Sequence, residues 1–414
     1  MRLGDVANEQ ARGTGKPLAG IRVLALEQMQ SLPYATQLLG RLGADVVKVE
    51  HPITGESGRA SQPAMRDPRG RPVGATFLRN NLSKRSIGID LKSPAGRDLI
   101  LQLAPRFDVV AENFKGGTMT RLGLGYGDIA AVHPGVIYLS VSGFGDEPDS
   151  PYADWPAYAS IVEGMSGIYE YMRPEGARPR ANPVGALGDI SSALFGVIGV
   201  FAALRQRDVT GIGQRVDIAM YDATIAMTDI VMNFASMGIP SGREVPVLLD
   251  TFQASDGYFV MQVVRDHQFQ ALAAIVGRRD WLADPRFAER AGWAEHLDSV
   301  IRPAVEQWAT TRTKREVVEL LAAAGVVSGP CHDAHDLIAD PHVERRNMIV
   351  EMPRTDDETG AILVPGNPVK LSAMAEGPEA RVPWLGEHTD AILADELGLD
   401  AAALAKLRAA KAIG

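Results

Sequence analysis

The sequence predicts an α/β protein with a large domain built on a parallel sheet, a smaller α+β domain and a C-terminal segment. Two observations carry this prediction. Short β-branched runs alternate with helical patterns through the first half of the chain, and from about Tyr258 one strand is followed by three amphipathic helices. Strands that alternate with helices are typical of a parallel sheet covered on both faces.

Six short apolar runs are the expected strands of the large domain, which we place at residues 1–224. They span residues 21–26, 45–50, 86–91, 108–113, 136–144 and 214–220. Helices are expected at 34–43, 95–106 and 221–238, and a long one after Asp189. Residues 51–74 are too rich in Gly and Pro for regular structure, and loops of this length are usually functional.

The smaller domain is placed at residues 225–330, with a strand at 258–263. Its three amphipathic helical patterns span residues 267–277, 296–311 and 314–325. The remaining segment, 331–414, is loop-rich. Within it we expect two short strands, at 349–352 and 362–366, and an Ala-rich helix at the end.

The composition is that of an ordinary globular protein, with 46% hydrophobic and 22% charged residues. A net charge of −9 argues against a nucleic-acid or anionic-membrane partner, which would require a basic face. Cys331 is the only cysteine, so no intramolecular disulfide or thiolate metal cluster is expected. Residues 1–16 have the character of a frayed polar tail, and the apolar run 190–204 is shorter than a membrane span of about 20 residues. We therefore expect a cytoplasmic protein with no membrane partner.

Several well-known catalytic motifs are absent from the sequence. There is no P-loop, no GxSxG elbow and no HExxH frame. The run Gly123–Asp128 lacks the third glycine of a dinucleotide fingerprint. His332 and His335 fit a solvated loop better than a metal site. No histidine occurs between His133 and His267, so no imidazole lies near Asp189 in sequence.

Asp189 opens a long apolar segment and is the residue most suggestive of chemistry. It has two interpretations. As a helix N-cap, its oxygen would accept backbone N–H groups of the first turn. As a nucleophile, it would be an ionised carboxylate in an apolar, glycine-lined pocket, beside the positive end of a helix that can hold a second anion.

Eight segments in a fixed order resemble the family III CoA-transferases (the CaiB/BaiF family), which include formyl-CoA transferases, carnitine CoA-transferases and α-methylacyl-CoA racemases. The resemblance runs from about Leu18 to Asp390. The segments are PLAGIRVLAL, LGADVVKVEHP, NNLSKRSIGIDLKSPAGRDL, VVAENFKGGTMTRLGLGY, ALGDISSALFGVIGVFAAL, TGIGQRVDIAMYDA, GVVSGPCHDAHDLIADPHV and WLGEHTD.

The resemblance implies that Asp189 is the nucleophile of a CoA-transferase. It would form an aspartyl-acyl anhydride and then an aspartyl-CoA thioester, with acyl-CoA and a carboxylic acid as substrates and no permanently bound cofactor. A carboxylate with a pKa near 4 needs no base for this attack. The resemblance also implies a Rossmann-like large domain to which residues 331–414 return, and an interlocked homodimer.

Ten further positions are implied as CoA contacts by the resemblance. They are Gln28, Met29, Gln30, His51, Lys84, Arg85, Asn113, Phe114, Arg121 and Tyr158. Arg121 could hold a phosphate through its guanidinium group. Lys84 and Arg85 are further phosphate candidates, with a solvated strand start as the alternative.

Departures from the family pattern narrow the expected activity. No glycine-run loop occurs between Pro240 and Tyr258, which speaks against formyl transfer. Ser142 stands where some members have a lysine. Tyr158 stands where racemases have a histidine, and a phenol with a pKa near 10 is a poor proton-exchanging base. Transferase is therefore preferred over racemase, and a CoA-binding protein without catalysis is the third alternative.

Three arginines, Arg173, Arg178 and Arg180, lie in the stretch that joins Tyr158 to Asp189. They are either a surface cluster or a grip for the distal carboxylate of a dicarboxylic acid, for which a guanidinium fork is well shaped. The second reading predicts succinate-like donors or acceptors.

Overall fold

The computed structural model describes residues 1–146, 149–171, 173, 176–181, 185–228, 231–239, 247–356 and 360–414. The chain forms two compact units. The first comprises Met1–Ser241 and Glu344–Gly414, and the second comprises Gly242–Val343. These divisions fall later in the chain than the expected bounds at 225 and 330.

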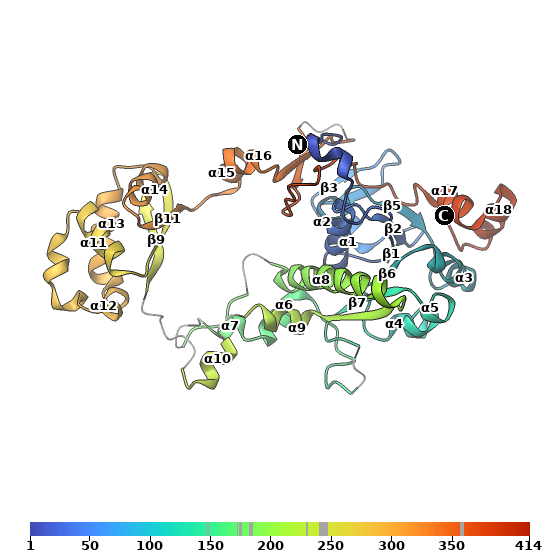
Figure 1. The fold of residues 1–414 in the computed structure, drawn as a ribbon, viewed down its shortest axis with the longest axis horizontal. Helices are drawn as coiled ribbons and strands as arrows, with labels where there is room; N and C mark the ends of the chain where they lie inside the picture. Colours follow the sequence, from blue (N-terminus) through green and yellow to red (C-terminus); the bar gives the residue numbers. More distant parts are fainter. Residues whose placement is uncertain are drawn as a thin grey trace. The chain divides into compact units, whose positions relative to one another are not determined.

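A six-stranded parallel sheet is the centre of the first unit (Figure 1). The strand order is β5 (Arg85–Gly88), β2 (Asp45–Glu50), β1 (Arg22–Leu26), β6 (Val109–Glu112), β7 (Ile137–Ser142) and β8 (Gln214–Ala219). Every neighbouring pair is parallel. All six strands coincide with runs predicted from the sequence, and the α/β class is confirmed.

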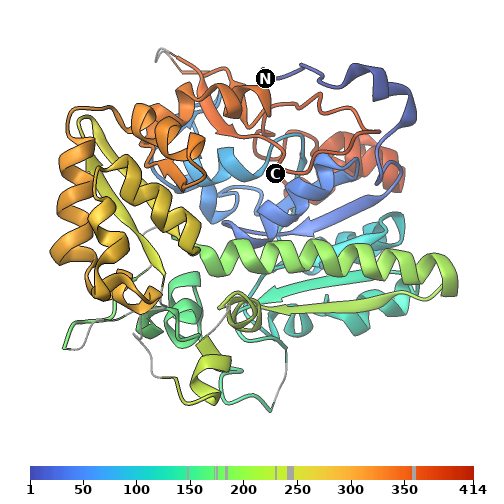
Figure 2. The same ribbon diagram turned by 60° about the vertical axis from the view of Figure 1, so that its left-hand side comes forward.

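Helices cover both faces of this sheet, as expected for parallel strands. On one face α1 (Ser31–Arg41) packs beside α8 (Leu187–Thr210), and buried leucines, valines and alanines of both helices join one core cluster with the strands (Figure 2). On the other face lie α3 (Pro94–Leu103), α5 (Tyr126–Val132), α17 (Thr389–Leu397) and α18 (Ala401–Ala409). The last two helices come from the C-terminal segment, which thus belongs to the same unit as the N-terminal half.

The order of the strands places a switch point between β1 and β6. From β1 the chain moves outward through β2 to β5, then returns to the other side of β1 and moves outward again through β6, β7 and β8. Loops at the carboxyl ends of β1 and β6 therefore diverge, and open α/β sheets bind ligands in the crevice that this divergence creates.

Helix α8 spans 24 residues and is longer than the apolar run within it, because its charged last turns are helical too. By length and composition alone it could cross a membrane, although 44% of its most apolar window is buried inside the structure. Its packing against α1, β7, β8 and α9 (Met220–Ala226) is that of a core helix of an α/β unit. The helix expected at 221–238 is divided into α9 and α10 (Val231–Ser236).

Two sequence predictions for the first unit are wrong. Residues 51–74 contain a short antiparallel hairpin of β3 (Ala64–Arg66) and β4 (Pro72–Gly74), followed by α2 (Ala75–Asn80). The hairpin turn is closed by Asp67, which accepts the backbone N–H of Arg69 at 2.8 Å. The N-terminal residues are not frayed, because the Met1 amino group donates to the carbonyl of Ile349 and Ala7 bridges Glu376.

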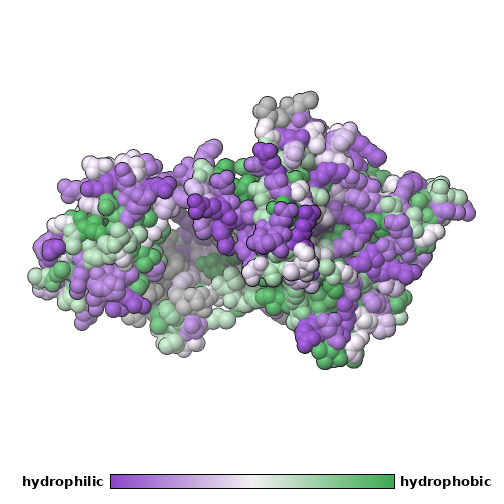
Figure 3. Space-filling view, turned by 45° about the horizontal axis from the view of Figure 1, so that its top comes forward, coloured by the Kyte–Doolittle hydropathy of each residue, from purple (hydrophilic) through white to green (hydrophobic). Residues whose placement is uncertain are grey.

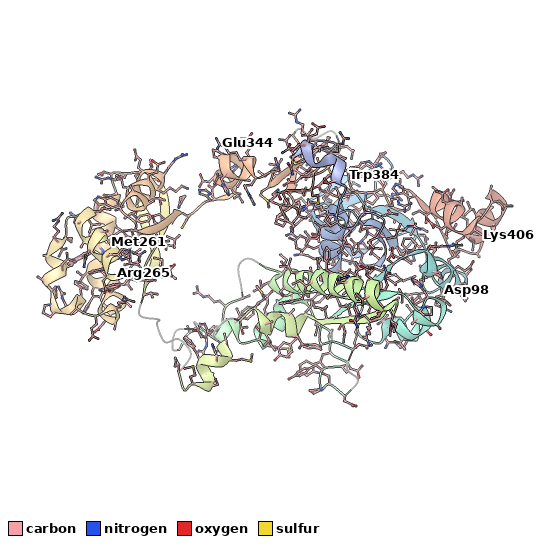
Figure 4. All side chains as sticks on the ribbon, in the orientation of Figure 1. Asp98, Met261, Arg265, Glu344, Trp384 and Lys406 are labelled. Atoms are coloured by element: carbon pink, nitrogen blue, oxygen red, sulfur yellow. The ribbon has the colours of Figure 1, made fainter. Side chains whose placement is uncertain are left out.

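The second unit pairs a three-stranded sheet with helices. The sheet order is β11 (Val327–Pro330), β10 (Gly257–Val263) and β9 (Leu248–Ala254), and the helices are α11 (Asp266–Ile275), α12 (Arg290–Glu295), α13 (Arg302–Ala309), α14 (Lys314–Ala323) and α15 (Ala334–Ala339). Only β10 was predicted among these strands. Figure 4 labels Met261 on β10, whose side chain is fully buried.

The segment around His332 and His335 is partly helical, because Asp333 caps α15 and accepts the backbone N–H groups of His335 and Asp336. The two short strands expected in the tail, β12 (Ile349–Met352) and β13 (Ile362–Pro365), are present after the short helix α16 (Pro341–Arg345). The structure shows that they pair antiparallel with each other.

Candidate active site

A cavity of about 360 Å³ lies at the carboxyl ends of β1, β6 and β7. Three loops that each follow one of these strands line it: residues 28–31, residues 113–116 and residues 142–145. Asp189, Tyr158 and an aromatic segment around Trp155 complete the wall. The cavity is therefore at the switch point of the sheet, where the fold predicts a ligand site.

Asp189 is the third residue of α8 and not its cap, since Ala186 occupies the N-cap position. The interpretation of Asp189 as an N-cap is thus wrong. Its carboxylate is half-buried, lines the cavity, and accepts no hydrogen bond from the described residues. Burial, and secondarily the charge of Glu163, raise the pKa of Asp189 to about 6. The pKa is higher than the sequence suggested, yet the group is still mostly ionised at neutral pH.

The start of α8 is pressed closely against α6 (Ala159–Met165). A Cβ atom on Gly188 would lie 2.9 Å from Val162 Cγ2 and 3.2 Å from Ala159 Cα. Only glycine permits this approach. The backbone N–H of Gly188 donates to Glu163 Oε1 at 3.1 Å, so the turn that carries Asp189 is held by both packing and a hydrogen bond.

The loops after β1 and β6 are tied together by one amide side chain. Asn113 accepts the backbone N–H of Gln28 at 2.9 Å and donates to the Gln28 carbonyl at the same distance. Met29 has a left-handed φ of 59°, and its N–H donates to the buried Glu56 at 2.9 Å. A strained, doubly anchored loop at the cavity wall is preorganised for ligand contact.

Aromatic rings form one side of the cavity. Phe144 contacts the rings of Tyr152 and Trp155, with centroids 5.2 and 6.3 Å apart. Phe114 lies on the wall after β6, where its backbone N–H donates to Glu112. Tyr158 lines the cavity with 76% of its surface exposed. Flat apolar surfaces beside an ionised group suit an acyl chain carrying a polar end.

The structure brings together seven of the eleven residues named from the sequence: Gln28, Met29, Gln30, Asn113, Phe114, Tyr158 and Asp189 all line the cavity. His51, Lys84, Arg85 and Arg121 do not. Arg121 is exposed on α4 (Thr118–Arg121), donates to Thr118 and lies against Gly117, one residue from the cavity wall. His51 is exposed and its Nδ1 accepts backbone N–H groups of its own turn.

The surroundings of Lys84 and Arg85 do not support a phosphate contact or a solvated strand start. Lys84 is 4% exposed, and its Nζ donates to Glu27 at 2.6 Å and to Pro33 and Asn81, both at 2.9 Å. All three ammonium protons are thereby used. Arg85 forms a two-pronged ion pair with Asp45 on the neighbouring strand, at 2.5 and 3.1 Å. In this structure Lys84 and Arg85 therefore form ion pairs within the fold.

The three arginines between Tyr158 and Asp189 do not line the cavity among the described residues. Arg173 pairs with Glu170 at 2.6 Å, and Arg178 and Arg180 are exposed. Met172, Pro174, Glu175 and residues 182–184 of this stretch lie outside the described residues, as does the part 240–246 of the segment in which no glycine run occurs. That one of the three arginines binds the distal carboxylate of a dicarboxylic acid stays a prediction.

Several residues of the site were not named as ligand contacts from the sequence. Lys115 lines the cavity directly after Asn113 and Phe114, and its place after a strand was a usable signal. Glu163 had no such signal, and Ser142 was noted only because some family members have a lysine there. Ser142 is 6% exposed and lines the cavity, yet its Oγ has no hydrogen-bond partner among the described residues. A buried hydroxyl without a partner is costly unless a ligand supplies one.

We expect Ser142→Ala to lower kcat/KM for the acyl substrate about fivefold without reducing stability, because a single hydrogen bond to ligand is worth roughly 1 kcal/mol. Steady-state kinetics and thermal unfolding measure the two effects. Ser140→Ala is the matched control on the same strand. Ser140 already donates to Glu112, so that variant should lose stability instead. Unchanged kinetics in Ser142→Ala would contradict the expected ligand contact.

Comparison with known proteins defines the family. Residues 18–389 match the model described as CoA-transferase family III. The chain belongs to CoA-transferase family III. It is accordingly an enzyme, a CoA-transferase, and the resemblance noted in the sequence is confirmed.

Relatives of known activity span almost the whole chain. Succinyl-CoA:mesaconate CoA-transferase of Haloarcula marismortui is 33% identical over 395 residues, which cover 92% of this chain and 97% of that protein. Succinate–glutarate CoA-transferase of Agrobacterium fabrum is 33% identical over 392 residues, covering 92% and 95%. Among solved structures, a CaiB/BaiF family protein from Brucella suis aligns with a TM-score of 0.82 at 31% identity, covering 92% of this chain and all of that one.

Proposed function

We propose that this family III CoA-transferase moves CoA from a dicarboxylyl-CoA donor to a carboxylic acid acceptor, with Asp189 as the nucleophile. The observation that carries the proposal is the carboxylate of Asp189, which is half-buried, unpartnered among the described residues and exposed to the cavity. The similarity to enzymes that use succinyl-CoA or succinate supports a dicarboxylic substrate.

The reaction begins when a carboxylate oxygen of Asp189 attacks the thioester carbonyl of the donor. The carbon–sulfur bond breaks, CoA thiolate leaves with the electron pair, and an aspartyl-acyl anhydride remains. The thiolate then attacks Cγ of Asp189 and expels the donor acid as a carboxylate. The product is an aspartyl-CoA thioester.

The acceptor acid completes the cycle by the same two steps in reverse order. Its carboxylate attacks Cγ of the aspartyl-CoA thioester, and CoA thiolate leaves. The thiolate attacks the acyl carbonyl of the acceptor, which departs as its CoA ester while Asp189 regains a carboxylate. One thioester replaces another, so no nucleotide hydrolysis is needed.

The cavity wall supplies the binding contacts in this proposal. Gln28, Gln30 and Asn113 offer amide groups, Met29 and Phe114 offer apolar surface, and Lys115 offers a positive charge for a phosphate or carboxylate of the ligand. CoA enters as a substrate and is not a resident cofactor. Arg121, which does not line the cavity but lies beside Gly117, one residue from the wall, is proposed to bind a phosphate group of CoA.

The test is to trap the covalent intermediate. The protein and Asp189→Ala are incubated with succinyl-CoA, quenched with hydroxylamine or borohydride, and analysed by intact-protein and peptide mass spectrometry. We expect a modification on the peptide that carries Asp189, absent from the variant. A modification that persists in Asp189→Ala would refute the assignment of the nucleophile.

The same incubation in deuterium oxide separates transfer from racemisation. A racemase would exchange the α-hydrogen of an acyl-CoA with solvent without any acceptor acid. No histidine lines the cavity among the described residues, and Tyr158 stands at the cavity mouth largely exposed. We therefore expect no exchange. Deuterium at the α-carbon together with no adduct would establish the racemase alternative.

We also propose a homodimer in the cytoplasm. Leu194, Ile198 and Val209 project from one side of α8 and are 41%, 61% and 70% exposed. A stripe of large apolar side chains on a long helix favours a protein interface. On the face that Figure 3 shows, hydrophilic and hydrophobic residues are interspersed. Sedimentation equilibrium would measure the mass of the assembly.

A further inference from the structure

A second buried carboxyl group lies beside Asp189 and takes no part in the mechanism above. Glu163, on α6, is 1% exposed. Its Oε1 accepts the backbone N–H of Gly188 at 3.1 Å, and its Oε2 accepts the hydroxyl of Tyr169 at 2.8 Å, from α7 (Ile168–Tyr171). The first of these hydrogen bonds attaches Glu163 to the residue directly before Asp189.

We propose that Glu163 is a positioning residue that favours acylation of Asp189, because its negative charge opposes the free carboxylate and not the neutral acyl derivatives. The inference rests on the proposed function, since it concerns the same nucleophile. It assigns to Glu163 no contact with the substrate, because Glu163 does not line the cavity.

The backbone keeps the two acidic residues from moving apart. Gly188 lies so close to α6 that a Cβ atom there would contact Val162 and Ala159 at 2.9 and 3.2 Å. The hydrogen bond from Gly188 to Glu163 fixes the carboxyl group at the same point. The first turn of α8 therefore cannot shift without losing both packing and a buried hydrogen bond.

No positive charge among the described residues lowers the pKa of Asp189. Burial and Glu163 together raise the pKa of Asp189 to about 6, burial being the larger cause. The elements packed against α6 and α8 carry further ionisable groups, several of them in ion pairs. The pairs are Glu170 with Arg173, Arg41 with Glu379, and Arg215 with Asp146 and Asp217; the other groups are Tyr34, Tyr138, Tyr169, Tyr171, Tyr221 and Asp222, and Tyr158 and Lys115 line the cavity.

The chemistry converts this repulsion into a driving force. In both covalent intermediates Asp189 carries an acyl or thioester group in place of its negative charge. The negative charge passes to the leaving thiolate or carboxylate. Once the donor acid has left the cavity, an interaction that disfavours the Asp189 carboxylate favours the acylated enzyme by about the factor by which it favours protonation. Since Glu163 is the smaller of two causes of the raised pKa, its share corresponds to about tenfold or less in the acylation equilibrium.

The test compares Glu163→Gln with the starting protein and with Tyr169→Phe. The first variant removes the charge and keeps an acceptor for Gly188. The second removes the hydrogen bond and keeps the charge. For each protein, acid-quenched intact-mass spectrometry gives the ratio of acylated to free enzyme with succinyl-CoA and CoA present, and kinetics give the acid limb of kcat/KM against pH.

We expect the acylated-to-free ratio to fall about 3- to 10-fold in Glu163→Gln, with the acid limb moved about 0.5–1 pH unit lower. In Tyr169→Phe, the pH at which kcat/KM declines on the acid side should not change. An unchanged ratio and limb in folded Glu163→Gln would overturn the inference. An equal shift in Tyr169→Phe would also overturn it, since the cause would then be structural. Glu163→Met, also uncharged, is prepared in parallel, and the same results are required of whichever uncharged variant folds.

Failure of the proposed function would look different. In that case the starting protein would form no adduct, or Asp189→Ala would retain one, whatever the behaviour of the Glu163 variants. An adduct on Asp189 whose abundance is insensitive to Glu163 leaves the proposed function intact and removes only this inference.

Discussion

Asp189→Asn is expected to abolish CoA transfer and, at neutral pH, to stabilise the fold. An amide cannot replace the carboxylate as nucleophile, so kcat should fall by about 10⁴-fold or more. The stability gain follows from the raised pKa of Asp189, about 6 against an ordinary value of 3.8. At pH 7.5 the side chain ionises more readily in the unfolded chain than in the folded chain. Ionisation of Asp189 therefore lowers the free energy of unfolding at this pH.

The pH dependence gives this prediction its sign. A carboxyl group whose pKa is raised by folding costs no stability below the unfolded pKa, and the cost grows until the pH exceeds the folded pKa. Asn carries no charge at any pH. The variant should therefore be more stable by about 1–3 kcal/mol at pH 7.5, and the two proteins should converge below pH 4.

Urea unfolding of both proteins at pH 7.5 and pH 4 measures the effect. The same pKa predicts that kcat/KM of the starting protein declines as the pH falls through about 6. A stability difference that is equal at both pH values would show that packing, not ionisation, distinguishes the two side chains. A less stable Asp189→Asn at pH 7.5 would contradict the raised pKa itself.

The inner strands β2, β1, β6 and β7 could be predicted from the sequence because they are buried on both faces and consist largely of apolar residues. The strand β9 lacked that signal, because Leu249, Thr251 and Gln253 are exposed and the half-buried Asp250 interrupts the apolar residues on its inner side. Asp250 instead pairs with Arg302 on α13. The hairpin β3–β4 could not be predicted from the sequence. Its turn is stabilised by a single side chain, that of Asp67, which accepts the backbone N–H groups of Arg69 and Arg71.

Two of the site residues implied by the family resemblance lie just after strands that the sequence predicts. Gln28 follows β1 and Asn113 follows β6, and parallel strands bring such positions to one edge of the sheet. Glu163 and the environment of Lys84 could not be inferred in this way. Both depend on partners distant in the sequence, at Gly188 and Glu27, which only the packing of helices and strands brings close.

Lys84 lies in a buried cluster of charged side chains that is connected to the cavity wall through Glu56 and Met29. Lys48 and Lys84 both approach Glu27 Oε1, at 3.3 and 2.6 Å, and Lys48 also lies 3.7 Å from Glu56, which holds the N–H of Met29. Desolvation lowers the pKa of Lys84 to about 8. The side chain is nonetheless mostly charged at pH 7, and the cluster is balanced with two acids and two bases.

Lys84→Met is therefore expected to destabilise the protein by about 3 kcal/mol, the usual cost of leaving a buried charge without one of its partners. The Michaelis constant for acyl-CoA should change less than twofold in the folded variant, because Lys84 has no free donor for a phosphate. Urea unfolding and steady-state kinetics measure the two quantities. Lys92→Met, at an exposed lysine of the same unit, is the control and should lie within about 0.5 kcal/mol of the starting protein.

A second substitution separates charge from packing. In Glu27→Gln combined with Lys84→Met, the uncompensated acid is removed as well, and part of the lost stability should return through the coupling between the two sites. If Lys84→Met instead kept its stability and raised the Michaelis constant for acyl-CoA tenfold, Lys84 would have to leave Glu27 and reach the nucleotide. The buried cluster would then be a feature of the empty enzyme, opened by substrate binding.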